Sequence, residues 1–311
     1  MSSQNTTSTL LTQLDAMISE GRNPETHGID LMSTRDVLTL INREDSKVAE
    51  AVKAAIPAIA NIVDKTVQRI QQGGRLFYLG AGTSGRLGIL DAVECRPTFS
   101  VPDGLVIGII AGGETAIQHA VEGAEDNAQA GANDLQHYKF SSQDVLVGIA
   151  ASGRTPYVIG ALQYARSIGA DTAALSCNPN ASIFEHADVA ICAQVGPECL
   201  TGSTRMKSGT AQKLILNMIS TTVMIRLGKT YQNLMVDVNA TNEKLKARAI
   251  RIVMQATGAS EADAKAALVE AEFNAKTAIL MLLTGMNKAM AEQALLKHNG
   301  FLRKATEQPD G

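Results

Sequence analysis

The hydrophobic positions of the chain follow two different patterns. From about Glu44 to Gln72, apolar residues recur every three or four positions, which predicts a long amphipathic helix that ends at Gly73 and Gly74. Beyond it, short segments that are apolar at nearly every position alternate with segments of helical spacing. The predicted strands cover 75–80, 105–112, 144–150, 171–177 and 187–193, and the predicted helices between the first four cover 84–94, 115–128 and 155–167.

This alternation predicts the fold class. Strands that are apolar throughout are typical of a sheet that carries helices on both faces. Strands and helices in alternation favour a parallel sheet with right-handed crossovers. We therefore expect an α/β fold with a doubly wound parallel sheet, in which ligands bind at the carboxyl ends of the strands.

Helical patterns also flank the alternating region. Two short helices are expected over 8–20 and 33–42, a long helix over 201–227, and several helices after residue 240 that each end at a glycine or a polar break. The last group predicts a small helical bundle. The expected domains are an N-terminal helical arm (1–43), an α/β domain (44–240) and a C-terminal helical bundle (241–311).

A turn rich in glycine and hydroxyl residues follows two of the predicted strands. Residues 80–86 read GAGTSGR, and residues 149–155 read IAASGRT. A helix that starts in such a turn presents free backbone N–H groups, which together with the helix dipole suit an anion such as phosphate. Glycine lets the ligand approach the backbone closely. The residues expected to bind phosphate are Gly82, Thr83, Ser84, Ser152, Gly153 and Thr155.

Other interpretations of these turns are weaker. A single turn of this kind is often only a tight connection between a strand and a helix. The letters GAGTSG also fit the dinucleotide pattern G-x-G-x-x-G, but the acidic residue expected about 20 positions later is missing, and Gly104 near that spacing begins an apolar strand. The Walker pattern is absent from the sequence. Because two turns occupy equivalent places, we favour phosphate binding.

Composition narrows the class of protein. The chain has 311 residues, of which 45% are hydrophobic and 19% charged, with a formal net charge of −3, as is typical of a globular protein. It has no tryptophan and no basic stripe, so we expect no nucleic-acid partner. The first residues lack a signal-peptide pattern, and no apolar run reaches the ~18 residues of a membrane span. We therefore expect no membrane partner.

Cysteine and histidine spacing gives no sign of a metal site. The five histidines are far apart in the sequence, and the four cysteines include no C-x-x-C pair. We expect buried free thiols in a reducing cytoplasm, and a chemistry without metal or other cofactor. The cysteines are Cys95, Cys177, Cys192 and Cys199.

Four longer segments carry a resemblance to a known family. They read GAGTSGRLGILDAVEC (80–95), AVEGAEDN (120–127), GIAASGRTPYV (148–158) and VGPECLTGSTRMKSGTAQKLILNMIS (195–220). With them the chain resembles the sugar isomerase (SIS) domain and, within that group, the N-acetylmuramic acid 6-phosphate etherases. The resemblance extends over nearly the whole chain, including RNP at 22–24, and the last segment is shared with the glucokinase regulatory proteins.

The resemblance implies a reaction and an architecture. Enzymes of this family cleave the lactyl ether of N-acetylmuramic acid 6-phosphate, giving N-acetylglucosamine 6-phosphate and D-lactate, by elimination and then addition of water. Such a reaction needs a base, an acid and no cofactor. The resemblance also implies a SIS domain that binds a sugar phosphate over 44–240, a ubiquitin-associated-like bundle over 241–311, a homodimer, and a role in recycling cell-wall amino sugars in the cytoplasm.

Two glutamates are the candidate acid and base. We expect Glu94 in the last turn of its helix because Pro97 blocks continuation, and both the negative helix end and partial burial favour a protonated carboxyl there. We expect Glu125 to share one helix side with Glu122 and Asp126, whose repulsion can keep one carboxylate basic. By match to the etherase segments, Glu94 is the acid and Glu125 is the base that removes the C2 proton.

The sequence departs from the family pattern beside Glu94. Val93 and Arg96 stand where the family has a small residue and a proline. A guanidinium directed at Glu94 weakens its role as an acid, whereas one directed at solvent leaves that role intact. The sequence alone leaves both arrangements open.

Segment 195–220 offers further binding residues. We expect Glu198 and Ser203 to line the sugar and Lys207 to meet the phosphate or a neighbouring subunit, with a structural ion pair as the alternative for Lys207. Two rival functions share the fold. One is an aldose–ketose isomerase, which needs no acid to release an ether substituent, and the other is a non-catalytic regulator that binds a sugar phosphate. The two acids together with segment 195–220 favour the etherase.

Overall fold

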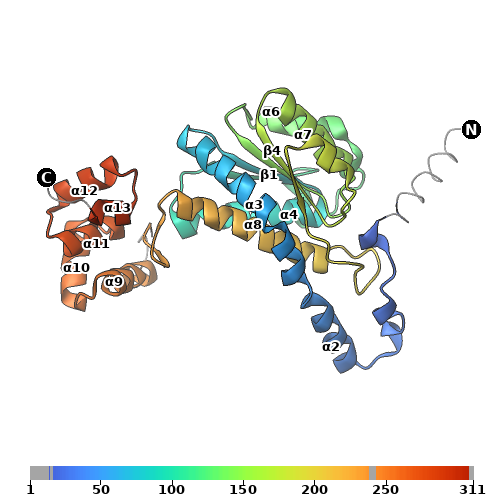
Figure 1. The fold of residues 1–311 in the computed structure, drawn as a ribbon, viewed down its shortest axis with the longest axis horizontal. Coiled ribbons are helices and arrows are strands. Elements are labelled where there is room, and N and C mark those ends of the chain that lie inside the picture. The colour runs from blue at the N-terminus through green and yellow to red at the C-terminus, as the bar shows by residue number, and fades with distance from the viewer. Residues whose placement is uncertain (1–13, 15–16, 238–242, 308–311) are drawn as a thin grey trace, which may run out of the picture. The chain divides into compact units, whose positions relative to one another are not determined.

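The computed structural model describes residue 14, residues 17–237 and residues 243–307 (Figure 1). Most of the helix expected over 8–20 therefore lies outside the described residues. Its described end is a 3-10 turn, η1 (Ile18–Glu20).

The chain divides into two compact units. The first comprises Met1–Ala92 and Gly104–Ile219, and the second comprises Val93–Asp103 and Ser220–Gly311. Two long helices, α4 (Gly82–Phe99) and α8 (Lys207–Arg226), contribute residues to both units. The domain boundaries expected after residues 43 and 240 stay predictions.

A five-stranded parallel sheet forms the centre of the first unit. Its order is β2-β1-β3-β4-β5, and every neighbouring pair is parallel. The predicted doubly wound α/β fold is confirmed, and each predicted strand is present with ends shifted by two residues or fewer. The strands are β1 (Leu76–Gly80), β2 (Val106–Ile110), β3 (Val145–Ile149), β4 (Asp171–Ser176) and β5 (Val189–Cys192).

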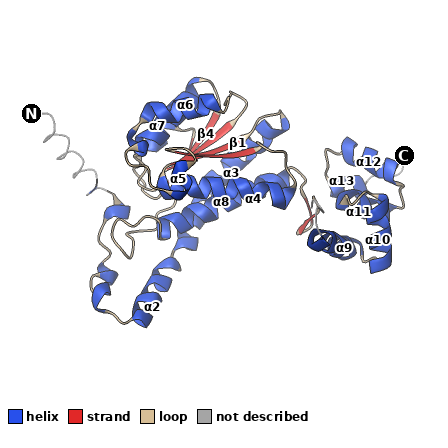
Figure 2. Cartoon of the chain, turned by 180° about the vertical axis from the view of Figure 1, so that it is seen from behind, coloured by secondary structure: helices blue, strands red, loops and turns tan. Residues whose placement is uncertain are grey.

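Helices cover both faces of this sheet. Figure 2 shows α6 and α7 on one face, and α3, α4 and α8 on the other. Both faces of the central strands are consequently dry, because every residue of β1 and β3 is buried. Besides α4 and α8, the helices are α2 (Thr34–Asp45), α3 (Val48–Gln71), α5 (Thr115–Gln118), α6 (Ala128–His137) and α7 (Pro156–Ser167).

Local sequence explains several helix ends. Ser33 caps α2 by accepting a hydrogen bond from the backbone N–H of Asp36, and Asn127 caps α6 in the same way. Gly73, with φ of +92°, follows the end of α3 in a conformation that other residues avoid. Pro57 lies inside α3, which the structure shows as one helix.

Two expected helices have different ends in the structure. The helix expected to stop at Glu94 continues through Pro97 to Phe99, because a proline in the last turn removes only one hydrogen bond. The single helix expected over 115–128 is wrong. Gly123, with φ of +72°, interrupts it, so the region forms the one-turn helix α5, the 3-10 turn η4 (Ala124–Asp126) and the start of α6.

The second unit contains a helical bundle, as the sequence predicts. A two-stranded antiparallel hairpin, β6 (Thr230–Tyr231) with β7 (Leu234–Met235), precedes it. Buried alanine, leucine and isoleucine residues form its own core. The helices are α9 (Glu243–Thr257), α10 (Glu261–Glu270), α11 (Ala275–Thr284), α12 (Lys288–Lys297) and α13 (Leu302–Thr306).

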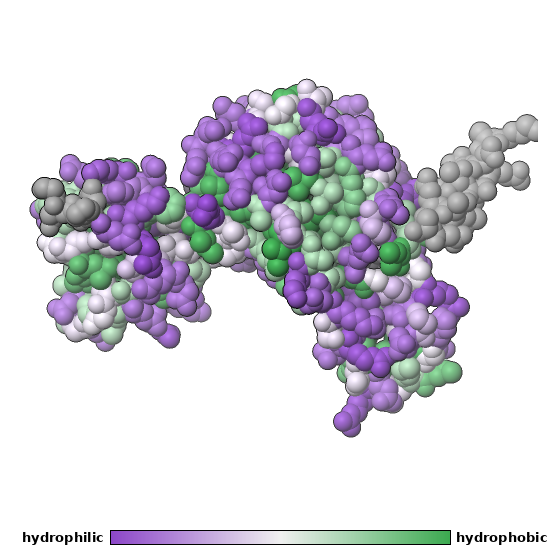
Figure 3. Space-filling model, viewed as in Figure 1, coloured by the Kyte–Doolittle hydropathy of each residue, from purple (hydrophilic) through white to green (hydrophobic). Residues whose placement is uncertain are grey.

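On the face shown in Figure 3, hydrophilic residues cover most of the surface, with apolar patches between them. No helix in the described part of the chain is long and apolar enough to span a bilayer. The four cysteines, all within the described residues, form no disulfide, and three of them are buried. Burial raises the pKa of Cys177 to about 12.

Candidate functional site

The two glycine-rich turns follow neighbouring strands at the centre of the sheet. β1 pairs with β3, and their last residues, Gly80 and Ile149, lie opposite each other. The strand order places β2 on one side of β1, and β3, β4 and β5 on the other. The crossovers therefore change direction between β1 and β3. This reversal is the position where open parallel sheets bind ligands, because the two loops diverge and leave a crevice.

The first turn, residues 80–86, leads directly into α4. Gly82 begins the helix with φ of +52°, which glycine adopts easily. Ser84 is buried, and its hydroxyl donates a hydrogen bond of 3.0 Å to Oε1 of Gln212 on α8. Thr83 is half-buried. Of the two hydroxyls expected to bind phosphate here, that of Ser84 already has a protein partner.

An open pocket of about 190 Å³ adjoins this turn, and we call it the first-turn pocket. Ala81, Gly82 and Arg86 line one side, and residues 120–125 line another. Arg86 donates hydrogen bonds to the backbone oxygens of Ala116 and Ile117, at 2.8 and 2.9 Å. Arg86 therefore anchors α5, from which the chain continues into the opposite wall.

Two carboxylates lie in the wall of the first-turn pocket. Glu122 and Glu125 both line it and are both exposed. The interruption at Gly123 separates them. The expected arrangement of Glu122 and Glu125 on one side of a common helix is therefore wrong. The structure nevertheless brings Glu125 to the same pocket as Gly82 of the first turn.

The second turn, residues 149–155, connects β3 with α7. Gly153 has φ of +75°, and a Cβ atom there would lie 2.2 Å from Cβ of Ala181, so the turn requires glycine. The hydroxyl of Ser152 accepts a hydrogen bond of 3.4 Å from the backbone N–H of Arg154. Thr155 is buried at the N-cap of α7, and its side chain makes no capping bond to the described backbone.

A separate pocket of about 270 Å³ adjoins the second turn, and we call it the second-turn pocket. Ser152, Gly153 and Arg154 line it together with Asn178 and Met17. Its other lining residues are Pro179, Asn180, Ala181 and Ser182. Among these described residues Arg154 carries a charge and none is a carboxylate, so the pocket suits an anion.

Glu198 has its partners within the protein. It is fully buried, and its two carboxylate oxygens accept hydrogen bonds of 2.9 Å from the backbone N–H groups of Lys207 and Ser208. The hydroxyl of Ser208 adds a third at 2.8 Å. Glu198 therefore caps the N-terminus of α8, where a negative charge is stabilised by the helix dipole. It lines neither pocket.

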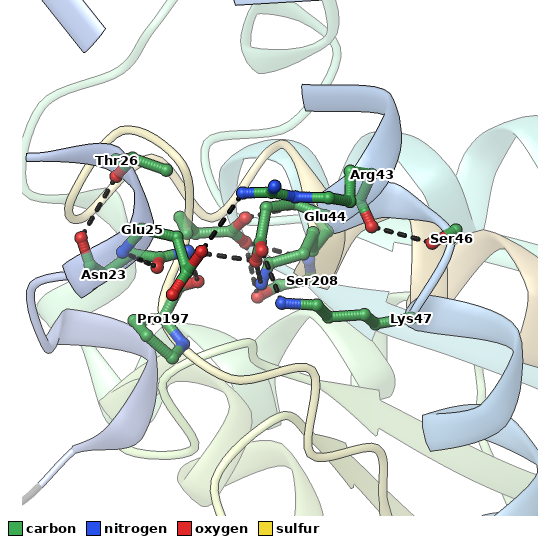
Figure 4. Close-up of polar contacts among 11 residues, drawn as sticks. Asn23, Glu25, Thr26, Arg43, Glu44, Ser46, Lys47, Pro197 and Ser208 are labelled. Carbon is green, nitrogen blue, oxygen red and sulfur yellow. Dashed lines mark hydrogen bonds and ion pairs between the residues drawn. The ribbon is translucent and has the colours of Figure 1, made fainter. Parts of the chain in front are cut away.

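Lys207 forms a buried ion pair, the alternative that the sequence left open. Its Nζ lies 2.8 Å from Oε2 of Glu44, and both side chains are 2% exposed or less. Lys47 and Asn23 also donate to Glu44 (Figure 4). Burial by itself raises the pKa of Glu44, but these donors outweigh it and lower the pKa to about 2. Ser203, in the loop before α8, is half-buried.

The candidate acid and base belong to different units. Glu94 lies in the part of α4 that belongs to the second unit and is exposed, so the expected partial burial is wrong. Arg96 lies 3.6 Å from Asp103, and both side chains are exposed. Glu125 belongs to the first unit. The pairing of Glu94 with Glu125 stays a prediction.

Several polar residues near the turns were not singled out from the sequence. Asn178, Gln212 and Glu44 are buried polar side chains that contact the turns or segment 195–220. Their sequence neighbours carry no motif that would reveal them, because their contacts with the turns and with segment 195–220 join residues 26 or more positions apart. In the described residues no cluster of histidine, cysteine, aspartate and glutamate could hold a metal ion.

Comparison with known proteins assigns the chain to a family. The N-acetylmuramic acid 6-phosphate etherase 2 of Vibrio cholerae is 61% identical over 303 residues, which are 97% of this chain and 99% of that protein. The chain belongs to the N-acetylmuramic acid 6-phosphate etherase family. The etherase of Rhizobium rhizogenes is 62% identical over 296 residues, 95% of this chain and 96% of that protein.

Family models place this chain among the SIS proteins. The N-terminal SIS domain of glucokinase regulatory protein matches residues 58–166, and the general SIS domain matches residues 128–221. The C-terminal lid domain of glucokinase regulatory protein matches residues 232–278. The resemblance inferred from the four sequence segments is therefore confirmed.

Proposed function

We propose that this protein cleaves the lactyl ether of N-acetylmuramic acid 6-phosphate and releases D-lactate and N-acetylglucosamine 6-phosphate. The observation that carries the proposal is identity above 60% with proteins named as this etherase, over at least 95% of the chain. The arrangement of two phosphate-type turns at the switch point of the sheet supports the same substrate class.

The proposed reaction uses acid–base chemistry alone. Opening of the sugar ring gives an aldehyde at C1, which makes the C2 proton acidic. A base removes this proton, the C3–O bond breaks, and an acid protonates the departing oxygen of D-lactate. Water then adds to the unsaturated aldehyde, placing a hydroxyl at C3 and a proton at C2. One water molecule is consumed, and no oxidation or reduction occurs.

Glu125 is the proposed base and Glu94 the proposed acid. The position of Glu125 in the wall of the first-turn pocket, together with Gly82, supports its role. The match of Glu94 to the etherase segment supports its role as the acid. Among the described ion pairs, the Arg96 guanidinium pairs with Asp103 and not with Glu94. An exposed carboxylate can exchange protons with solvent between the two half-reactions.

We further propose how the substrate is held. Ser152, Gly153 and Thr155 bind the phosphate, whereas Gly82 and Thr83 of the first turn contact the sugar across the switch point and Ser84 stays bonded to Gln212. Ser203 lines the sugar, whereas Glu198 and Lys207 hold the loop that carries it. The support for this division is that Glu198 and Lys207 are at most about 2% exposed and bonded within the protein.

The family also supports a cellular setting. We propose that the protein acts as a homodimer in the cytoplasm and contributes to the recycling of cell-wall amino sugars. Its apolar exposed side chains in α2 and α4, such as Leu38 and Leu90, are compatible with a subunit interface.

The function is tested by following D-lactate release from N-acetylmuramic acid 6-phosphate in D₂O. The wild type should release D-lactate and leave one deuterium at C2 of the sugar product, because elimination removes the C2 proton and the later addition returns one from solvent. Glu94→Gln should abolish release while N-acetylglucosamine 6-phosphate still binds. Binding of the sugar phosphate without any release by the wild type would contradict the etherase and favour the regulator. Exchange at C2 with aldose–ketose conversion would favour the isomerase.

A further inference from the structure

The segment that contains the RNP motif at 22–24 has no role in the chemistry proposed above. Ser19 in this segment is buried, with 1% of its surface exposed. The backbone N–H of Ser19 donates to Oδ1 of Asn178 at 3.1 Å, and Nδ2 of Asn178 donates to the hydroxyl of Ser19 at 3.0 Å. These two residues are 159 positions apart in the sequence. A reciprocal pair of this kind fixes both the distance and the orientation of the two segments.

Asn178 also holds the second turn. Its Nδ2 lies 3.1 Å from the backbone oxygen of Ala151 and 3.2 Å from that of Ser152. The residue is 4% exposed, so water does not replace these bonds readily. One amide side chain therefore joins the N-terminal segment to the turn that carries Ser152.

A second contact fixes the other end of the same segment. Nδ2 of Asn23 donates to Oε2 of Glu44 at 2.9 Å and to the backbone oxygen of Pro197 at 3.4 Å. Figure 4 shows the Asn23 side chain close to both Glu44 and Pro197. Between these two attachments the segment has little freedom to move away from the second turn.

The fixed segment reaches the second-turn pocket. Met17, two residues before Ser19, lines that pocket beside Ser152 and Arg154. The position of Met17 depends on the attachment of Ser19, because Ser19 bonds this end of the segment to Asn178 in the loop after β4.

We propose that residues 17–19 form one wall of the substrate pocket and that Asn178 is the positioning residue that joins this wall to the second turn. The inference rests on the proposed function, since it assigns the second-turn pocket to the sugar phosphate. Asn178 does not take part in proton transfer. It acts by keeping the hydroxyl of Ser152 and the side chain of Met17 at a fixed separation, which lowers the free energy needed to order the pocket when substrate binds.

The replacement Asn178→Asp tests the proposal with almost no change in shape. It keeps the acceptor for the N–H of Ser19 and replaces the Nδ2 donor with an oxygen that faces two carbonyls. We expect KM for N-acetylmuramic acid 6-phosphate to rise about tenfold or more while kcat stays within about threefold, because the pocket is disturbed and the acid and base are not. The matched control is Asn133→Asp on α6, an exposed residue that bonds to Gln129, and it should leave both constants unchanged.

A second variant covers the case in which Asn178→Asp does not fold. Ser19→Ala removes one hydrogen bond from the N-terminal segment and leaves the second turn untouched. We expect its KM to rise about two- to tenfold, in line with the loss of a single buried hydrogen bond. Unchanged KM in a folded Ser19→Ala protein would overturn the proposal, as would a fall in kcat without a change in KM.

Hydrogen–deuterium exchange provides a readout that a purely structural contact would not change. Saturating N-acetylglucosamine 6-phosphate should slow exchange in peptides covering residues 17–26 of the wild type, and this protection should be lost in Asn178→Asp. Protection confined to residues 150–155 would show that the N-terminal segment is no part of the pocket. If the wild type binds this ligand with protection at 17–26 but releases no D-lactate, the proposed reaction fails and the proposed wall survives.

Discussion

The two glycine-rich turns have similar sequences but different surroundings. In the first turn, Ser84 bonds to Gln212 and Arg86 bonds to backbone oxygens, so both side chains stabilise the protein itself. In the second turn, Ser152 and Arg154 line a pocket, and no side-chain bond from Arg154 occurs among the described contacts. A shared sequence pattern therefore does not imply a shared role.

The pockets beside the two turns also differ, in the charged residues that line them. The first-turn pocket contains two carboxylates, Glu122 and Glu125, which would repel a phosphate. Each pocket is lined by one arginine, Arg86 in the first and Arg154 in the second, but the second-turn pocket contains no carboxylate among its described lining residues. The contrast supports the proposal that proton transfer takes place at the first pocket and that the second pocket holds the phosphate.

The largest test of this contrast is Glu125→Gln. We expect kcat to fall by about 10²- to 10⁴-fold, because an amide cannot remove the C2 proton, while the affinity for N-acetylglucosamine 6-phosphate changes little. Glu122→Gln is the matched control from the same pocket, and it should lower kcat by less than about tenfold. Equal losses in the two variants would show that the pocket depends on its total charge rather than on Glu125.

The buried ion pair at the start of α8 is tested by Lys207→Met. Removal of the ammonium leaves Glu44 buried without its main partner, so the free energy of unfolding should fall by about 3–5 kcal/mol in urea denaturation at neutral pH. Lys53→Met breaks an exposed pair with Glu50 and should cost no more than about 1 kcal/mol. Similar losses would contradict a specific role for the buried pair.

The same pair predicts a dependence of stability on pH. The pKa of Glu44 is about 2 in the folded protein and 4.5 ordinarily, so its contribution is complete above pH 4.5 and is lost as the pH falls toward 2. In Glu44→Gln, urea denaturation should show a shallower loss of stability over this range than in the wild type. Parallel curves for the two proteins would show that other carboxylates cause the acid sensitivity.

Exchanging serine for alanine in each turn sharpens the comparison. Ser152→Ala should raise KM about tenfold with little change in stability, because Ser152 lines a pocket and its hydroxyl accepts a long bond of 3.4 Å. Ser84→Ala should instead lower the free energy of unfolding by about 1–3 kcal/mol, because it leaves a buried amide of Gln212 without its partner. Steady-state kinetics and thermal unfolding of both variants distinguish the two outcomes.

The two arginines provide the smallest expected effects. Arg86→Met should lower kcat by about three- to tenfold, since α5, from which the chain continues to Glu125, loses its two bonds from Arg86. Arg154→Met should raise KM by a similar factor and leave kcat nearly constant. A rise in KM for Arg86→Met together with a fall in kcat for Arg154→Met would exchange the proposed roles of the two pockets.

Local patterns in the sequence were sufficient for the sheet and for the two turns. The strands around Leu79 and Ile149 are apolar at nearly every position, so their burial is visible from the sequence alone. The helix ends were harder to predict. Pro97 is tolerated in the last turn of α4, and Gly123 interrupts a region whose spacing resembles a helix, because backbone conformation at one glycine can outweigh the periodicity around it.

The roles of charged residues were the least predictable part. Lys207 and Glu198 lie in a segment rich in hydroxyl residues. A lysine and a glutamate there suit contacts with a sugar phosphate as well as they suit bonds within the protein. Only the fold shows that Glu44 from α2 meets Lys207 and that the N-terminus of α8 meets Glu198. A buried charge requires a partner, and which partner is near depends on how distant segments pack.

The sequence by itself determined the fold class, the order of strands and helices, and the two turns, because each depends on residues within a few positions of one another. The tertiary structure decided which turn lies beside a pocket with carboxylates, which arginine is bonded to the backbone, and that Ser19 meets Asn178. These outcomes depend on contacts between segments up to 159 residues apart, and no local pattern of apolar and polar positions records such contacts.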